Sequence, residues 1–104
     1  PIGSRGLGDV YKRQAYTAVA GDQIMVNTTG GAITVTLPAS PSTGDEVSFL
    51  DARGTFNTNN LTIGRNSQPI EGAATDDVLS TAGQSITLVY VDATRGWTYK
   101  TNTA

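Results

Sequence analysis

Acidic pairs are the residues of this chain whose types and spacing come closest to catalytic chemistry. The sequence has no histidine and no cysteine, which removes the commonest general base and every thiol nucleophile. Two acidic pairs are adjacent in sequence, Asp45-Glu46 and Asp76-Asp77. Adjacent residues of a strand point to opposite faces, so neither pair is placed for joint acid–base work. We expect both pairs in turns or at strand ends, where Asp hydrogen-bonds to nearby backbone.

A metal site built from these carboxylates is the main alternative to a structural role. Calcium needs six to eight oxygen ligands, and the sequence shows no such set around either pair. We therefore predict no metal, no cofactor and no enzymatic activity.

Aromatic residues near the end of the chain offer a second kind of chemistry, the binding of a sugar ring. Trp97 and Tyr99 are two residues apart, so in a strand they share a face, and Asp92 and Arg95 precede them closely. These four residues are the candidate glycan contacts. The alternative, which we favour, is that Trp97 closes the end of a thin hydrophobic core.

Length and composition limit the classes of protein to which the chain can belong. A chain of 104 residues with 38% hydrophobic and 7% aromatic residues can form one domain with a thin core. Sixteen threonines and twelve glycines favour strands and tight turns. The net charge of −2 argues against a nucleic-acid partner, and no apolar run is long enough for membrane insertion. A domain this small without disulfides often relies on self-association for stability.

The first fourteen residues differ in character from the rest of the chain. They hold three of the seven Lys and Arg residues and show neither strand nor helix periodicity. Ser4–Gln14 resembles translated sequencing-adaptor sequence of the kind found at the unassembled edges of metagenomic reads. We interpret residues 1–14 as a non-native leader, disordered or extended, and residues 15–104 as one β-sandwich module of a longer protein. The alternative is a genuine flexible arm.

The remaining sequence alternates between apolar and polar residues in short stretches separated by turn signals. The clearest case lies between Gly21 and Pro38, where two alternating stretches flank Gly30-Gly31 and predict a hairpin. Further strands are predicted at 16–20, 46–51, 60–64, 68–71, 78–79, 85–92 and 97–99. About eight or nine short strands predict an all-β fold, either a small antiparallel β-sandwich or a jelly-roll-like barrel.

Some of these strands carry apolar residues on both faces. Within 85–92, two valines lie opposite the inward residues, and Met25 and Leu50 do so in their own strands. A strand that is apolar on both faces is normally covered on both. In a chain this short, the second cover would be a neighbouring subunit. The predicted interface residues are Met25, Leu50, Val89 and Val91, and the alternative is that they are scattered surface hydrophobes.

A set of short motifs runs from Ala15 to about Tyr99. They are Gly21–Pro38 with Ser40–Asp45, Gly54–Phe56, Thr58–Ile63, Arg65-Asn66, Ile70–Gly72, Thr87–Val91 and Gly96-Trp97. Together they resemble a module of bacteriophage tail fibres and virion appendage proteins.

The resemblance implies a virion structural protein exposed to the extracellular medium. Such modules are β-rich homotrimers that form a rigid shaft or a tip in host attachment. The implied partners are other copies of the chain, other virion proteins and a host-surface glycan, and the resemblance carries over no catalytic residue. The alternative function is a monomeric carbohydrate-binding module that uses Trp97 and Tyr99.

Overall fold

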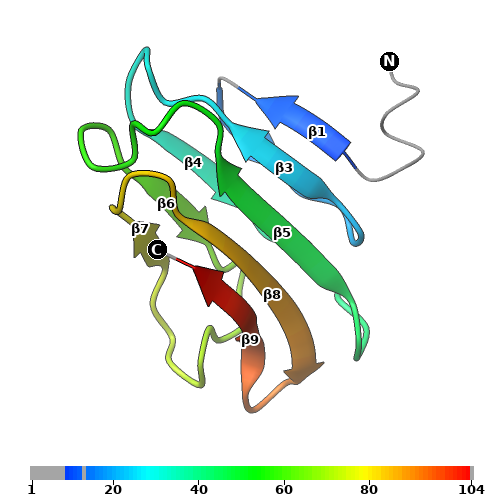
Figure 1. Cartoon of the computed structure of the whole chain (residues 1–104). Coiled ribbons are helices and arrows are strands. Elements are labelled where there is room, and N and C mark those ends of the chain that lie inside the picture. The colour runs from blue at the N-terminus through cyan, green and yellow to red at the C-terminus, as the bar shows by residue number, and fades with distance from the viewer. Residues whose placement is uncertain (1–8, 13, 104) are drawn as a thin grey trace.

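Two β-sheets make up the part of the chain that the structure describes. The computed structural model describes residues 9–12 and 14–103, with side chains from residue 14 onward. Its strands are β1 (Asp9–Lys12), β2 (Tyr16–Thr17), β3 (Gln23–Val26), β4 (Ile33–Thr36), β5 (Glu46–Asp51), β6 (Leu61–Gly64), β7 (Asp77–Leu79), β8 (Ser85–Asp92) and β9 (Gly96–Thr103). Figure 1 shows the larger sheet in front of the smaller one.

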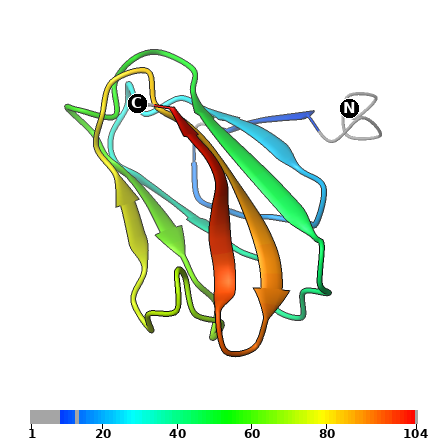
Figure 2. The same ribbon diagram turned by 60° about the horizontal axis from the view of Figure 1, so that its bottom comes forward.

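The two sheets pack face to face as a sandwich. One sheet has the strand order β1-β3-β5-β8-β9 and the other has the order β2-β4-β6-β7. Figure 2 shows the two layers separated along their length, so the strands do not close into a barrel. The predicted all-β sandwich is therefore confirmed, with nine strands among the described residues, and the barrel alternative is wrong. The predicted leader at 1–14 lies partly outside the described residues, and its residues 9–12 form β1.

The pairing within each sheet is mixed, which corrects the prediction of an antiparallel fold. The first six strands alternate between the sheets, so β1, β3 and β5 are parallel neighbours, as are β2, β4 and β6. Antiparallel pairing enters only with β7, β8 and β9. Period-2 alternation reports which face of a strand is buried, but it does not report which strand lies beside it.

The predicted hairpin between Gly21 and Pro38 is wrong for the same reason. Its two strands exist as β3 and β4, but they belong to opposite sheets. The connection between them crosses the end of the sandwich. Asn27 shapes this crossing, because its Oδ1 accepts hydrogen bonds from the backbone N–H and the hydroxyl of Thr29 at 3.0 and 2.6 Å. Such a turn serves a crossing between sheets as well as a hairpin.

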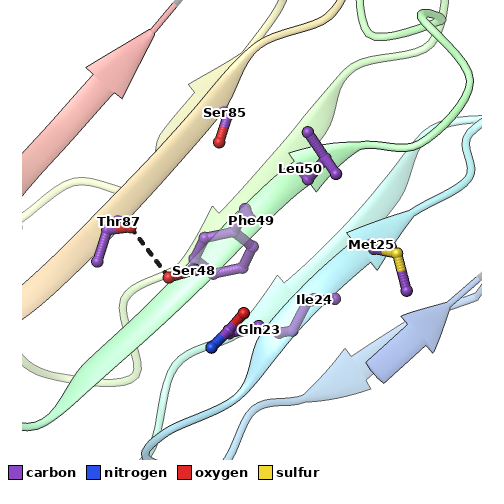
Figure 3. A pocket seen from close by; sticks show the side chains of 8 residues that line it. All are labelled: Gln23, Ile24, Met25, Ser48, Phe49, Leu50, Ser85 and Thr87. Atoms are coloured by element: carbon purple, nitrogen blue, oxygen red, sulfur yellow. Dashed lines mark hydrogen bonds between the residues drawn. The ribbon is translucent and has the colours of Figure 1, made fainter. Parts of the chain in front are cut away.

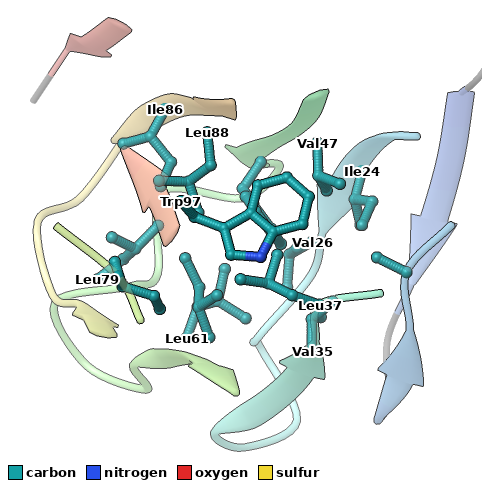
Figure 4. Close-up of a cluster of buried hydrophobic side chains, with 14 of the residues drawn as sticks. Ile24, Val26, Val35, Leu37, Val47, Leu61, Leu79, Ile86, Leu88 and Trp97 are labelled. Carbon is teal, nitrogen blue, oxygen red and sulfur yellow. The ribbon is translucent and has the colours of Figure 1, made fainter. Parts of the chain in front are cut away.

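The hydrophobic core lies between the sheets and contains the inward residues predicted from alternation. Its buried members are Ala18, Ile24, Val26, Ile33, Val35, Leu37, Val47, Phe49, Phe56, Leu61, Ile63, Ile70, Leu79, Ile86, Leu88, Tyr90 and Trp97. Figure 4 shows the Trp97 indole in the middle of this cluster, between side chains of the two sheets. The largest side chain of the core therefore lies at its centre, among aliphatic side chains and the rings of Phe49, Phe56 and Tyr90.

The start of β9 is held by a segment of the β6–β7 connection. The backbone N–H of Trp97 donates to the Pro69 carbonyl at 2.8 Å, and the N–H of Glu71 donates to the Trp97 carbonyl at 2.7 Å. The predicted strand at 68–71 is thus only a bridge at Ile70, paired with Trp97. This bridge ties the smaller sheet to the edge of the larger one.

Candidate functional site

The outer face of the five-stranded sheet carries the predicted interface residues. Met25 and Leu50 are direct partners in the parallel pair β3–β5, and the two residues are 38% and 42% exposed. Figure 3 shows Met25 on β3 beside Leu50 on β5. The structure therefore brings these two residues together on a surface that faces away from the core.

An open groove is partly lined by this apolar pair. It has a volume of about 350 Å³ and crosses β3, β5 and β8. Its lining residues are Gln23, Ile24, Met25, Ser48, Phe49, Leu50, Ser85 and Thr87. The hydroxyls of Ser48 and Thr87 are hydrogen-bonded to each other across the groove at 3.0 Å (Figure 3). The lining residues carry no charge, so the groove suits an uncharged partner surface.

The two predicted valines lie further along the same sheet. Val89 pairs with Glu46 in the β5–β8 ladder, whereas Leu50 pairs with Ser85, four positions away along β8. At a strand rise of about 3.4 Å per residue, Val89 lies roughly 14 Å along the sheet from the Leu50 row. Val89 is half-buried, and Val91 is 37% exposed. The predicted interface residues therefore form two groups instead of one continuous seam.

The end of the sheet that contains Val89 is charged. Lys100 on β9 forms an ion pair with Glu46 on β5, with 2.9 Å between Nζ and Oε2. Both side chains are exposed, so this pair contributes little to the stability of the fold. Its charges make this end of the outer face less suited to apolar contact than the Met25–Leu50 end.

Trp97 does not present a surface for a sugar ring. Its side chain is completely buried, and it packs edge-on against Tyr90 with 5.5 Å between ring centroids. Neither face of the indole is open to a ligand, so the structure agrees with the core role of Trp97. An amphipathic ring near a chain end is compatible with both roles in sequence, and only burial distinguishes them.

The other candidate glycan contacts serve local structure. The Tyr99 hydroxyl donates to Asp77 on β7, and burial together with this carboxylate raises the pKa of Tyr99 well above its usual range. Asp92 accepts the backbone N–H groups of Thr94 and Arg95 at 3.0 and 2.7 Å in the β8–β9 turn. The four residues therefore do not form an aromatic platform with polar neighbours.

The acidic pairs lie where the sequence predicted them, in turns and at strand ends. Asp45 accepts the backbone N–H of Ser42 at 2.8 Å, and Asp76 accepts that of Arg65 at 3.0 Å. Within residues 9–12 and 14–103, no three Asp, Glu, His or Cys side chains are grouped closely enough to hold a metal ion.

No helix in the described part of the chain is long and apolar enough to span a membrane.

Glu71 is a structural carboxylate that the sequence analysis did not single out. Its Oε2 accepts the backbone N–H of Tyr99 and the hydroxyl of Thr98, each at 2.7 Å, and its Oε1 lies 2.7 Å from Nη2 of Arg95. The Tyr99 N–H, the Thr98 hydroxyl and the Arg95 charge lower the pKa of Glu71 against a smaller opposing effect of burial. Its partners are 24 to 28 positions away, so no local pattern could reveal this role.

Asp51 is a second such carboxylate, located at the end of β5 with only 6% of the residue exposed. Burial raises its pKa, but four backbone N–H groups outweigh burial, so the net effect lowers the pKa below its ordinary value of 3.8. The four donors are Arg53, Thr55, Phe56 and Gly83 at 3.3, 3.1, 3.0 and 2.9 Å. Asp51 thus fixes the loop after β5 to the turn before β8.

We expect Asp51→Asn to lower the free energy of unfolding by about 1–3 kcal/mol at pH 7, because the amide accepts these N–H groups less well and adds a misplaced donor. The pKa of Asp51 is lower in the folded chain, so its contribution is complete above the unfolded pKa and is lost as the pH falls through the folded one. Urea unfolding followed from pH 7 down to pH values below 3.8 should therefore show a difference between the two proteins that shrinks as the pH falls. A constant difference across this range would contradict the assigned charge role.

Comparison with protein-family models and with curated proteins assigns the chain to no family. No protein-family model matches the chain, and no curated protein matches it.

Proposed function

We propose that the chain is a non-enzymatic structural module of a phage tail fibre or virion appendage, which associates into a homotrimer through the outer face of its five-stranded sheet. The observation that carries this proposal is the exposed apolar pair Met25 and Leu50 beside an uncharged groove. The motif resemblance from Ala15 to Tyr99 supplies the class of protein and the trimeric state. The same proposal places the chain in the virion. Its proposed partners are other virion proteins and a host-surface glycan.

The distribution of polar groups supports an assembly surface over a reaction site. Apolar side chains that cluster beside a concave surface are typical of contact with another protein. The acidic pairs, by contrast, are hydrogen-bonded to neighbouring backbone. The described residues thus offer a surface for packing more readily than a set of groups for catalysis.

The motifs that carry the resemblance also have structural roles. Ile70–Gly72 and Gly96-Trp97 meet in the bridge that holds β9, and Gly54–Phe56 lies in the loop that Asp51 fixes. Motifs of this kind define the shape of the module and leave its outer faces free to vary. The proposed mechanism is accordingly geometric, since three rigid sandwiches would form a shaft or a tip.

We expect Leu50→Asp to convert the trimer into a monomer of 10.8 kDa. The leucine is 42% exposed in a single copy, so the aspartate disturbs the fold of one copy little. In the assembly the same charge would be buried without a partner, at a cost of several kcal/mol. Sedimentation equilibrium measures the change in mass directly.

The matched control is Val78→Asp on the outer face of the other sheet. Val78 is 50% exposed on β7 and lies outside the proposed interface, so this variant should keep the mass of the unchanged protein. A monomeric unchanged protein at high micromolar concentration would contradict the trimer. A trimer that survives Leu50→Asp but dissociates with Val78→Asp would place the interface on the smaller sheet.

The carbohydrate-binding alternative receives no support from the geometry. It requires an accessible aromatic face, and Trp97 has none. A host glycan therefore remains a partner of the proposed assembly without an assigned site on this chain.

A further inference from the structure

The side of β3 that faces away from β5 is paired with a strand from the segment that resembles translated adaptor sequence. β1 runs parallel to β3, with Asp9 opposite Gln23 and Lys12 opposite Val26. Figure 1 shows β1 along the outer side of β3, at the edge of the larger sheet. A four-residue strand thus completes this edge although, on our interpretation, its residues were never selected for this fold.

Pairing of this kind depends mainly on the backbone. In a parallel pair, evenly spaced N–H and C=O groups of one strand meet those of the other, whatever the side chains are. Addition of an extended segment to a sheet edge is a common mode of recognition that gains its affinity from these main-chain bonds. The presence of an adaptor-like strand at this edge indicates that β3 places few demands on the side chains of its neighbour.

The position of β2 explains why the preceding segment reaches this edge. Tyr16 and Thr17 pair with Val35 and Thr36 of β4, and the Ala18 N–H donates to the Thr36 carbonyl at 2.7 Å. The chain is therefore anchored in the smaller sheet at residue 16. Only three residues separate β1 from β2, so Asp9–Lys12 is tethered close to β3. This short tether gives the segment a high effective concentration at the edge.

We propose that the side of β3 facing away from β5 is an acceptor for a parallel β-strand. It pairs through the backbone with an extended segment joined to Ala15, and the side chains of that segment matter little. The partner is thus a short extended stretch of the same chain. The edge would otherwise present unpaired N–H and C=O groups, which are prone to unwanted strand addition. This inference is independent of the proposed trimer, since it concerns the edge of the sheet and not its outer face.

Hydrogen–deuterium exchange of the β3 amides in the full chain tests the proposal. One variant replaces all of Asp9–Lys12 with threonine, which keeps the tendency to form a strand but removes the original side chains. Its β3 amides should exchange as slowly as in the unchanged chain. The other two variants are Val10→Pro and Tyr11→Pro. In a parallel pair, alternate residues direct their N–H toward the partner, so only one proline should remove a bond to β3. That variant should exchange about tenfold faster at the β3 edge.

Three outcomes would overturn the proposal. Fast exchange in the threonine variant would show that the edge requires particular side chains. Unchanged exchange with both prolines would show that β1 does not occupy the edge in solution. The amides of β8 report on the whole fold. Faster exchange of these amides in the threonine variant, or in both proline variants, would show that β1 is an integral part of the core structure.

Discussion

Replacement of Gly96 by alanine is expected to destabilise the fold by about 4 kcal/mol or more, or to prevent folding. A Cβ atom at this position would lie 1.9 Å from the Pro69 carbonyl oxygen, which belongs to the backbone, so no side chain can rotate to relieve the contact. The backbone at Gly96 also has a φ of 72°, which L-residues other than glycine rarely adopt. Separation of the two segments would break the 2.8 Å bond from the Trp97 N–H to Pro69. Urea denaturation of both proteins would measure the loss.

Gly83→Ala is the matched control for this experiment. Gly83 has a similar φ of 79°, but a Cβ built there meets no atom within 4 Å. Its substitution should therefore cost only the left-handed backbone penalty of about 1–2 kcal/mol. Equal losses for the two alanine variants would show that the contact with Pro69 has no consequence, and that the strain at Gly96 is conformational alone.

Trp97→Ala is expected to lower the free energy of unfolding by about 3–5 kcal/mol, a large share of the 5–15 kcal/mol typical of a domain. The indole is completely buried at the centre of the core, so its removal leaves a cavity between the two sheets (Figure 4). Calorimetry or urea unfolding would show the loss as a large drop in melting temperature or midpoint.

Trp97→Phe sharpens this test. Among the described residues, the indole Nε1–H has no hydrogen-bond partner, so phenylalanine loses volume but no polar contact. We expect a smaller loss than with alanine. If Trp97→Ala left the melting temperature unchanged but abolished binding to a glycan column, Trp97 would be a ligand-binding residue and the core assignment would be wrong.

The faces of the strands could be predicted from sequence because burial follows a simple period. Ile24, Val26, Ile86 and Leu88 alternate with polar or less buried neighbours, and all four are in the core. The same period placed Met25 and Leu50 on the outside. Sheet membership could not be predicted, since a strand buries one face whether its partner is the next strand in the chain or the one after that.

The structural carboxylates could not be found in the same way. Asp51 binds backbone N–H groups of residues up to 32 positions away, and Glu71 binds groups that approach only after β9 has folded against the β6–β7 connection. Backbone donors are present at almost every residue and therefore leave no signature in the sequence. The outward position of Met25 and Leu50 could be predicted because it follows from the period of the strand, and their role in assembly stays a prediction.

The alternation of the first six strands between the sheets has a consequence for how the chain folds. Parallel partners are far apart in sequence, with Gln23 beside Ser48 and Ile33 beside Leu61. Contacts of this kind form slowly, because long loops must close before any pairing is gained. The ring at the centre of the core is Trp97, which belongs to β9, the last strand of the described residues. The core between the two sheets is therefore complete only once β9 has joined the larger sheet.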